Sequence, residues 1–142
     1  MPAYVSTSVF PNGTTVENAI ESLLDLAINN IELSSVHQHE DNIAAAVAHY
    51  DAKFLTHNFF PPVPGRLVLN IASSDEKIRT ASLSFIKEAI DFAEKMDIPI
   101  YTIHPGFVAD PVGESDTKDN HDFRFAHDAA GDPKAAFEHF LN

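Results

Sequence analysis

Short apolar segments alternate with longer segments of helical periodicity along most of this chain. Four segments rich in β-branched and aromatic residues lie at positions 3–10, 31–36, 52–60 and 98–104. Segments of this length and composition predict β-strands. A strand, a helix and a second strand in succession form a right-handed βαβ unit, in which the strands are parallel and the helix covers the sheet. The alternation therefore predicts an α/β fold built from about four parallel βα repeats.

Helices are predicted between and after these strands, because apolar residues recur there every three or four positions. Two of the helices begin with capping-box spacings, Thr14 with Glu17 and Ser73 with Glu76. The third helix is the best defined, because a long stripe of apolar residues runs along one of its sides. The stripe consists of Ile78, Ala81, Phe85, Ala89, Ile90 and Ala93. The helices are expected at residues 14–30, 42–50, 75–96 and from 133 onward.

The length of the chain bounds how these units can be arranged. Its 142 residues, 44% of them hydrophobic, suit one domain with a substantial core, and no Gly- or Ser-rich linker divides them. Four βα units can form a small open doubly wound sheet, or half of an eight-stranded barrel of about 250 residues. Length alone favours the open sheet. The polar segment 108–132 is the one extended irregular stretch, long enough to carry a function.

Charge and composition exclude several classes of function. The net charge of -12 would repel a phosphate backbone, so we expect a small-molecule partner rather than nucleic acid. Without cysteine, any metal must be held by His, Asp or Glu. A Gly-rich phosphate loop and a serine nucleophile elbow are both absent, so the sequence does not support NAD or ATP as a cofactor. A signal-peptide pattern and an apolar run of about 20 residues are also missing, and we expect a cytoplasmic protein without a membrane partner.

Two histidines are expected at the carboxyl ends of neighbouring strands. Because side chains alternate along a strand, Thr102 and His104 share one face of the fourth strand, and Lys53 and His57 share one face of the third. Parallel α/β folds place their ligands at this end of the sheet. His57 and His104 together suit a divalent metal, with zinc and manganese as the first candidates. The alternative is that each ring hydrogen-bonds to backbone in a turn.

The remaining polar candidates have structural alternatives as well. Glu32 falls in the middle of a predicted strand, where it is expected either to act as a catalytic carboxylate or to pair with Lys53 one strand over. The latter is the favoured interpretation from spacing. His37 and His39 have a His-x-His spacing but follow a strand in a polar segment, so we interpret them as part of a solvated loop. The histidines within residues 121–127 are interpreted in the same way.

Two motifs around these histidines carry a family resemblance. The run HNFFPPVPGRLVLNIAS starts at His57, and IPIYTIHPGF ends the fourth strand with His104. Together with the capped helix between them they resemble the xylose isomerase-like TIM-barrel superfamily, over residues 4–109. The resemblance implies that residues 1–142 form a single domain, the N-terminal half of a TIM (β/α)8 barrel. The resemblance matches His57 and His104 to metal-ligand positions of the endonuclease IV branch. Asn70 is the asparagine of the same motif set, in the segment that follows the third strand. The resemblance also places Glu32 in a strand that lines the barrel.

The resemblance also implies a function. We expect a metal-dependent isomerase or epimerase of a small sugar or sugar phosphate. Two alternatives are an endonuclease IV-like phosphodiesterase acting on abasic DNA and a noncatalytic half barrel that binds a partner. The family's other ligands come from strands five to eight, so the isolated chain is expected to lack a complete active site. We expect a homo-oligomer, or completion of the barrel by a C-terminal half.

Overall fold

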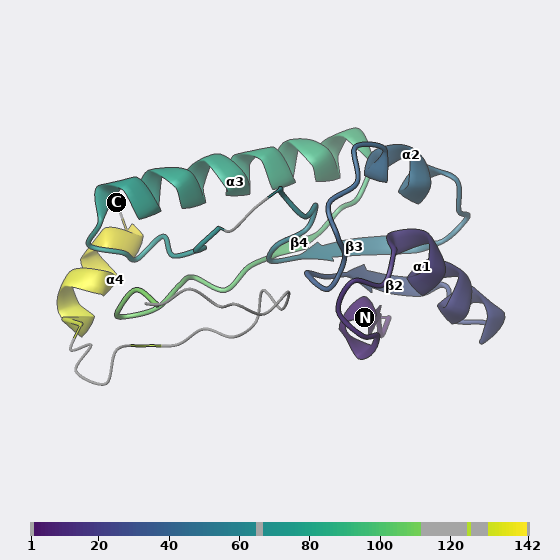
Figure 1. Cartoon of the computed structure of the whole chain (residues 1–142), viewed down its shortest axis with the longest axis horizontal. Coiled ribbons are helices and arrows are strands. Elements are labelled where there is room, and N and C mark those ends of the chain that lie inside the picture. The colour runs from purple at the N-terminus through teal and green to yellow at the C-terminus, as the bar shows by residue number, and fades with distance from the viewer. Residues whose placement is uncertain (1, 65–66, 112–124, 126–130, 142) are drawn as a thin grey trace. The chain divides into compact units, whose positions relative to one another are not determined.

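The computed structural model describes residues 2–64, 67–111, 125 and 131–141, and its strands form one parallel sheet (Figure 1). The strands are β1 (Val5–Ser6), β2 (Asn30–Leu33), β3 (Lys53–His57) and β4 (Tyr101–Thr102). The helices are α1 (Val16–Asp25), α2 (Ile43–Ala48), α3 (Glu76–Lys95) and α4 (Pro133–Leu141), and a 3-10 helix covers Thr7–Val9. The parallel βα repeats expected from the sequence are confirmed.

The order of the strands decides between the open sheet that chain length favours and the half barrel that the family resemblance implies. Each strand pairs with the next one in the chain, in the order β1-β2-β3-β4. A doubly wound sheet reverses its order at a switch point, whereas a barrel adds each new strand beside the last. The structure therefore has the strand order of a barrel wall, and the open sheet favoured by chain length is wrong.

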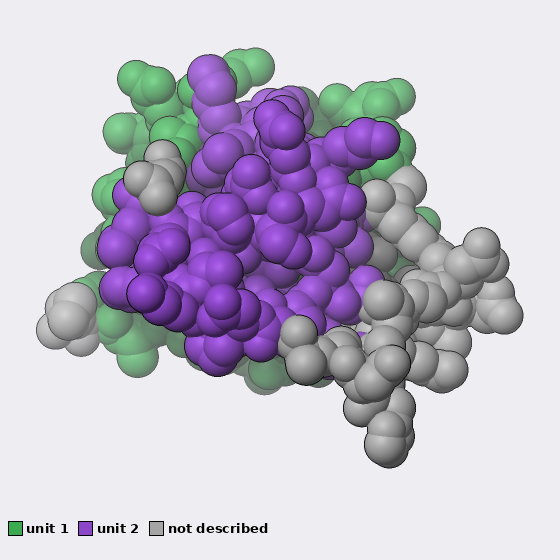
Figure 2. Space-filling model, turned by 90° about the vertical axis from the view of Figure 1, so that its left-hand side faces the viewer, with its two compact units in different colours: residues 1–64, 89–103 green, residues 65–88, 104–142 purple. Residues whose placement is uncertain are grey.

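The chain divides into two compact units, which Figure 2 distinguishes by colour. Unit 1 comprises residues 1–64 and 89–103, and unit 2 comprises residues 65–88 and 104–142. The helix α3 contributes residues to both units. The expectation of a single domain over residues 1–142 stays a prediction.

The core of unit 1 lies between the strands and the helices. Ile31 and Leu33 of β2 are completely buried, and Phe54 of β3 is 8% exposed. They form a cluster with apolar residues of α1 and α2, namely Val16, Ile20, Leu23, Ile43 and Val47. Because side chains alternate along a strand, the residues between them, including Glu32, face the other side of the sheet.

The helix α1 begins one residue later than its predicted capping box. The N-cap is Thr15, whose hydroxyl accepts a hydrogen bond from the Asn18 amide at 3.2 Å. Thr14, the predicted cap, instead donates its hydroxyl to the Pro11 carbonyl at 2.7 Å. The turn that precedes the helix therefore uses the hydroxyl that the sequence pattern assigned to the cap.

The start of α3 also differs from its predicted capping box. Asp75 Oδ1 accepts from the Lys77 amide at 2.8 Å, so Asp75 caps the helix. The predicted cap, Ser73, accepts from the Asp75 amide at 3.0 Å and donates to Asp110 at 2.7 Å. Ser73 therefore shapes the turn before the helix and holds a carboxylate 37 residues further along the chain.

The buried stripe of α3 is shifted from the predicted one. Ala81 is exposed and Ile90 is 50% exposed, whereas Ser82 is completely buried. The Ser82 hydroxyl accepts from the Asn70 amide at 2.9 Å and approaches the Ile78 carbonyl at 2.7 Å, so its burial leaves no polar group unpaired. Phe85, Ala89 and Ala93 are buried as predicted.

The helix α4 starts at Pro133, as the sequence predicted. Asp132 Oδ1 caps this helix by accepting a hydrogen bond from the Lys134 amide at 2.9 Å. None of the helices that the structure describes is long and apolar enough to cross a membrane.

Candidate functional site

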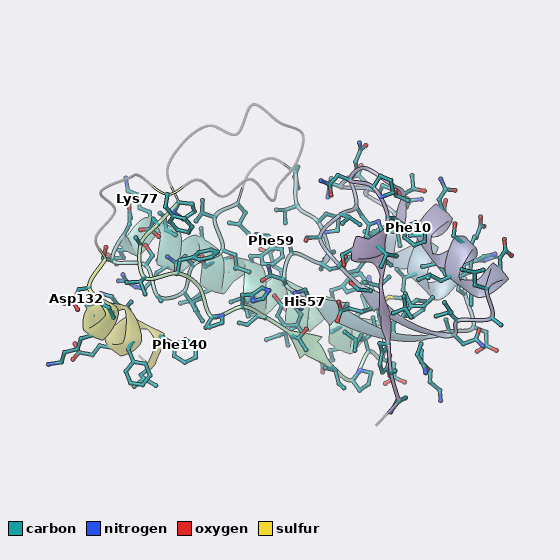
Figure 3. All side chains as sticks on the ribbon, turned by 90° about the horizontal axis from the view of Figure 1, so that it is seen from below. Phe10, His57, Phe59, Lys77, Asp132 and Phe140 are labelled. Carbon is teal, nitrogen blue, oxygen red and sulfur yellow. The ribbon has the colours of Figure 1, made fainter. Side chains whose placement is uncertain are left out.

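The carboxyl end of β3 is tied to β4 through His57. His57 is the last residue of β3, as the sequence predicted, and it lies opposite Thr102 in the sheet register. The two side chains therefore share a face, and His57 Nδ1 lies 2.7 Å from Thr102 Oγ1 (Figure 3 labels His57). The imidazole is half-buried and held by a specific partner in the neighbouring strand.

The turn after His57 is fixed by two further hydrogen bonds. Asn58 adopts a left-handed backbone conformation with φ of 50°, which asparagine tolerates better than most residues. Its amide donates to the Thr102 carbonyl at 2.7 Å, and its carbonyl accepts from the Tyr101 hydroxyl at 2.8 Å. Burial raises the pKa of Tyr101, so this phenol stays protonated and remains a donor. The strand end that presents His57 is thus rigidly connected to β4.

Glu32 lies on the same face of the sheet as His57. Glu32 is opposite Ser6 of β1 and Leu55 of β3, and Leu55 precedes His57 by two residues. The predicted pairing of Glu32 with Lys53 is wrong, because Lys53 is opposite Asn30 and the two charged groups form no ion pair in the described part of unit 1. The parallel register moves the lysine two residues toward the amino end of the sheet. Glu32 as a catalytic residue stays a prediction.

His104 belongs to unit 2 and lies in the loop that follows β4. His104 was predicted to end the fourth strand, but β4 ends at Thr102, so His104 lies two residues beyond the strand and is exposed. The next turn is held by Asn70, whose Oδ1 accepts from the Phe107 amide at 2.9 Å. Gly106 has φ of 121°, and a Cβ there would overlap the Asn70 side chain. Asn70 is completely buried, so the loop that carries His104 rests on a fixed support.

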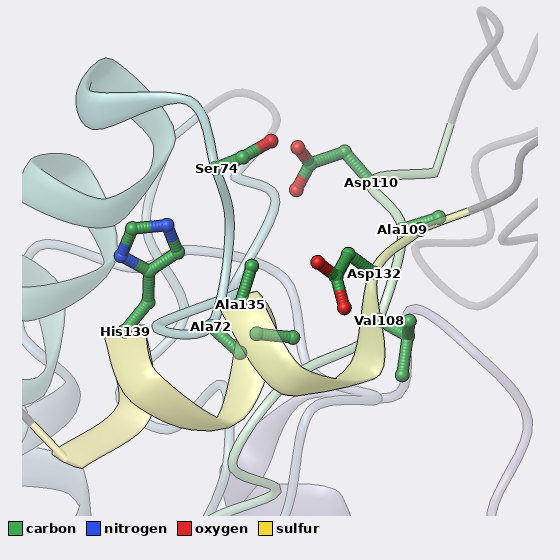
Figure 4. Close-up of a pocket in the computed structure, with 10 residues that line it drawn as sticks. Ala72, Ser74, Val108, Ala109, Asp110, Asp132, Ala135 and His139 are labelled. Carbon is green, nitrogen blue, oxygen red and sulfur yellow. The ribbon is translucent and has the colours of Figure 1, made fainter.

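Asn70 also organises a carboxylate that the sequence argument did not single out. Its amide nitrogen Nδ2 donates to Asp110 Oδ1 at 2.7 Å, and Ser73 donates to Asp110 Oδ2 at the same distance. Asp110 lines a pocket of about 300 Å³ in unit 2, together with Asp132 and His139 (Figure 4). The only signal in the sequence was its position six residues after His104, in a segment interpreted as a loop.

The proposed metal ligands are divided between the units. His57 lies in unit 1 and His104 in unit 2. Among the residues that the structure describes, no group of three or more His, Asp or Glu side chains is arranged to hold a metal ion. A shared site for His57 and His104, and the identity of its metal, stay predictions.

His37 is buried, which contradicts the solvated loop expected around it. It is 4% exposed; its Nδ1 lies 2.8 Å from the Thr14 carbonyl and its Nε2 lies 2.8 Å from Thr7 Oγ1. A carbonyl only accepts, so Nδ1 carries the proton and Nε2 accepts from the Thr7 hydroxyl. Thr7 in turn accepts from the Ser34 amide at 3.0 Å. Desolvation lowers the pKa of His37, which keeps the ring neutral.

The other loop histidines have different environments. His39 is exposed, as expected, but its ring contacts the Pro62 carbonyl at 2.8 Å and Asp41 at 3.3 Å. The rings of His37 and His39 therefore bind different partners. His121 and His127 lie outside the described residues.

Comparison with known proteins identifies the family. Residues 15–131 match a family described as xylose isomerase-like TIM barrel. The chain belongs to this family. The resemblance inferred from the two histidine motifs is thereby confirmed, and the strand order agrees with one wall of such a barrel.

One curated relative illustrates how much of a family member this chain covers. The uncharacterized protein MJ1614 of Methanocaldococcus jannaschii is 29% identical over 107 residues, which are 72% of this chain and 40% of the relative. The chain therefore spans less than half the length of that relative. No solved structure matches the chain significantly.

In the xylose isomerase-like family, the two faces of the sheet correspond to the inside and the outside of a barrel. In a TIM barrel, helices cover the outside, alternate strand residues fill the interior, and active sites form at the carboxyl ends of the strands. Glu32 and His57 lie on the face opposite the core cluster, which corresponds to the barrel interior. His57 lies at the carboxyl end of β3, and TIM barrels form their active sites at the carboxyl ends of the strands.

Proposed function

We propose that this protein is a metal-dependent isomerase or epimerase of a small sugar or sugar phosphate. The family membership supports a sugar-modifying enzyme. The observation that carries the proposal is the position of His57 at the carboxyl end of β3, on the sheet face that also bears Glu32. This face corresponds to the interior of a TIM barrel, whose substrates bind at the carboxyl ends of the strands. An imidazole and a carboxylate therefore share the interior face of the sheet.

The residues of the chain have separate tasks in the proposed reaction. His57 and His104 would hold a divalent metal, for which neutral imidazole is the commonest ligand. When bound there, the metal would supply Lewis-acid polarisation of a substrate carbonyl. Glu32 takes a proton from the carbon beside that carbonyl and returns it during product formation.

The chemistry of His57 fits a metal ligand. Ligating histidines usually hydrogen-bond through their second ring nitrogen, which fixes the ring and its protonation. Thr102 makes such a contact with Nδ1 of His57. Because Nδ1 contacts Thr102, we propose Nε2 as the nitrogen that would bind the metal.

The remaining ligands of the proposed site come from strands beyond β4. The chain spans 40% of its curated relative. Two histidines are also fewer than the three protein ligands that catalytic metal sites of the zinc type commonly use. We propose that further strands, from a longer chain or from a second copy, complete both the barrel and the site.

The acidic character of the chain favours a small substrate over DNA. A phosphodiesterase that acts on abasic DNA requires Lys and Arg to contact phosphates, and the chain has 9 basic residues against 21 acidic ones. Cleavage of an oligonucleotide with an abasic site by the complete protein would favour this alternative over the isomerase.

Deuterium exchange tests the proposal directly. The complete protein is incubated in D₂O with ketoses and ketose phosphates, while NMR follows deuterium incorporation at the carbon beside the carbonyl. Glu32→Gln is expected to keep the metal and to lower exchange by about 100-fold or more, because it removes the base. His57→Ala is expected to lower both the metal content and the exchange rate.

His49 offers a matched control for the histidine substitution. It is exposed at the end of α2, in the same unit as His57. His49→Ala is expected to keep the metal content and the exchange rate of the wild type. A full metal content in His57→Ala would show that His57 is not a ligand, and the absence of exchange with every sugar would contradict the isomerase itself.

A further inference from the structure

Thr102 is the residue through which β4 controls the orientation of the His57 ring. Thr102 and His57 are register partners at the ends of adjacent parallel strands. Thr102 contacts His57 Nδ1 through its side chain at 2.7 Å, and its carbonyl accepts from the Asn58 amide at 2.7 Å. One residue of β4 therefore holds both the ring of His57 and the backbone that follows it.

The direction of the side-chain hydrogen bond determines which ring nitrogen carries the proton. The Thr102 hydroxyl lies 3.5 Å from the Thr56 carbonyl, which can only accept. When the hydroxyl proton points to Thr56, Thr102 Oγ1 accepts from His57 Nδ1–H. Nε2 of the neutral ring then carries the lone pair that a metal requires.

We infer that Thr102 is a positioning residue, whose hydroxyl selects the Nδ1-protonated tautomer of His57 and so presents Nε2 to a divalent metal. This inference rests on the ligand role of His57 in the proposed function. It adds a residue to the site from the strand next to the ligand. Neither Thr102 nor the tautomer followed from the spacing of the histidines.

The opposite hydrogen-bond direction has a different consequence. If the Thr102 hydroxyl donates to Nδ1, the proton of the neutral ring resides on Nε2. Such a ring cannot bind a metal through Nε2 until the proton moves. The tautomer of His57 in the metal-free protein therefore distinguishes the two directions without any assay of activity.

Long-range ¹⁵N–¹H NMR of the metal-free, complete protein at about pH 8 measures this tautomer, because an ordinary imidazole is neutral there. We expect the Nδ1-protonated form in the wild type. Thr102→Val keeps the branched shape without the hydroxyl and is expected to lose this preference. Thr102→Ser keeps the hydroxyl and is expected to restore the wild-type spectrum.

Zinc titration of the same proteins measures the effect on the ligand. Thr102→Val is expected to weaken zinc binding by about 10- to 100-fold, the loss usual for partners that orient a metal ligand. Thr102→Ser is expected to bind as the wild type does. Thr80→Val, at an exposed position of α3, is the matched control and is expected to change neither the tautomer nor the affinity.

The two measurements separate the failure of this inference from the failure of the proposed function. An Nε2-protonated His57 in the wild type would overturn the inference, as would wild-type zinc affinity in Thr102→Val. A wild-type protein that binds no zinc or manganese would instead overturn the metal-dependent function. In that case an Nδ1-protonated ring that depends on the Thr102 hydroxyl would still support its control of the tautomer.

Discussion

At the scale of single residues, the polar side chains inside unit 1 differ in how well they are satisfied. His37 and Thr7 form a connected set in which each polar atom has a partner. Thr56, on β3, is completely buried, and its hydroxyl has no hydrogen-bond partner in the described part of the chain. Buried polar groups of the first kind stabilise a fold, whereas a group of the second kind lowers its stability.

Replacement of Thr56 by valine is expected to stabilise the protein. Valine has nearly the shape of threonine and removes an unpaired hydroxyl from the core, and a strand tolerates both residues well. The expected gain is about 1 kcal/mol in the free energy of unfolding. Chemical denaturation measures it, with the matched substitution Thr80→Val on the exposed side of α3 as the control. A loss of stability in Thr56→Val would show that the hydroxyl has a partner.

His37 is expected to make the stability of unit 1 depend on pH. Burial lowers its pKa in the folded protein below the ordinary value of 6.5, so the unfolded chain binds a proton more readily. The contribution of the neutral ring is therefore fully present above pH 6.5 and is lost as the pH falls through the lowered pKa. Denaturation at a series of pH values between about 7.5 and 4.5 measures this loss.

The substitution His37→Gln separates this effect from the titration of other groups. It is expected to lower stability at neutral pH and to flatten the dependence on pH below 6.5. His49→Gln, at an exposed position, is expected to leave the wild-type pH dependence unchanged. An equal pH dependence in wild type and His37→Gln would mean that His37 does not cause it.

At the scale of elements, β1 and β4 are several residues shorter than their predicted segments, and the two predicted helix caps also differ from the observed ones. Both predicted capping boxes are wrong by one or two residues, because the hydroxyls of Thr14 and Ser73 are used in the turns before the helices. A capping-box spacing is a local pattern and contains no information on whether the hydroxyl has another partner. The four predicted helices are all present, although α1 ends earlier than predicted and the buried stripe of α3 is shifted.

The cap of α1 gives a direct test of its starting residue. Thr15→Ala is expected to cost about 1 kcal/mol, because it removes the acceptor of the Asn18 amide. Ser22→Ala, an exposed position within the same helix, is expected to change stability by no more than about 0.5 kcal/mol. Equal unfolding free energies of Thr15→Ala and the wild type would contradict Thr15 as the N-cap.

At the scale of the whole molecule, the sheet that the structure describes has two edge strands, β1 and β4. In the part of the chain that the structure describes, β1 pairs only with β2, and β4 pairs only with β3. Strand edges of this kind offer unpaired backbone groups to other strands. In the TIM barrels of the xylose isomerase-like family, further strands pair with both edges and close the sheet into a barrel.

The isolated 142-residue chain is expected to associate in solution. Pairing of the edges of β1 and β4 with other strands would satisfy backbone groups and cover the interior face of the wall. Light scattering over a hundredfold range of concentration, on the order of micromolar and above, measures the particle mass. A monomer of 15.6 kDa at every concentration would contradict this expectation.

The sequence by itself determined the parallel βα repeats, the family and the position of His57 at the end of β3. These features follow from apolar periodicity and from motifs within short segments, where the physical signal is local. The strand order of the structure confirmed the half barrel that the family resemblance implied. The tertiary structure alone decided the burial of His37, the register of Glu32 with Leu55, and the contacts of Asn70 and Thr102. Each depends on residues far apart in the chain, such as His57 and Thr102 at a separation of 45 positions, so no local pattern encodes it.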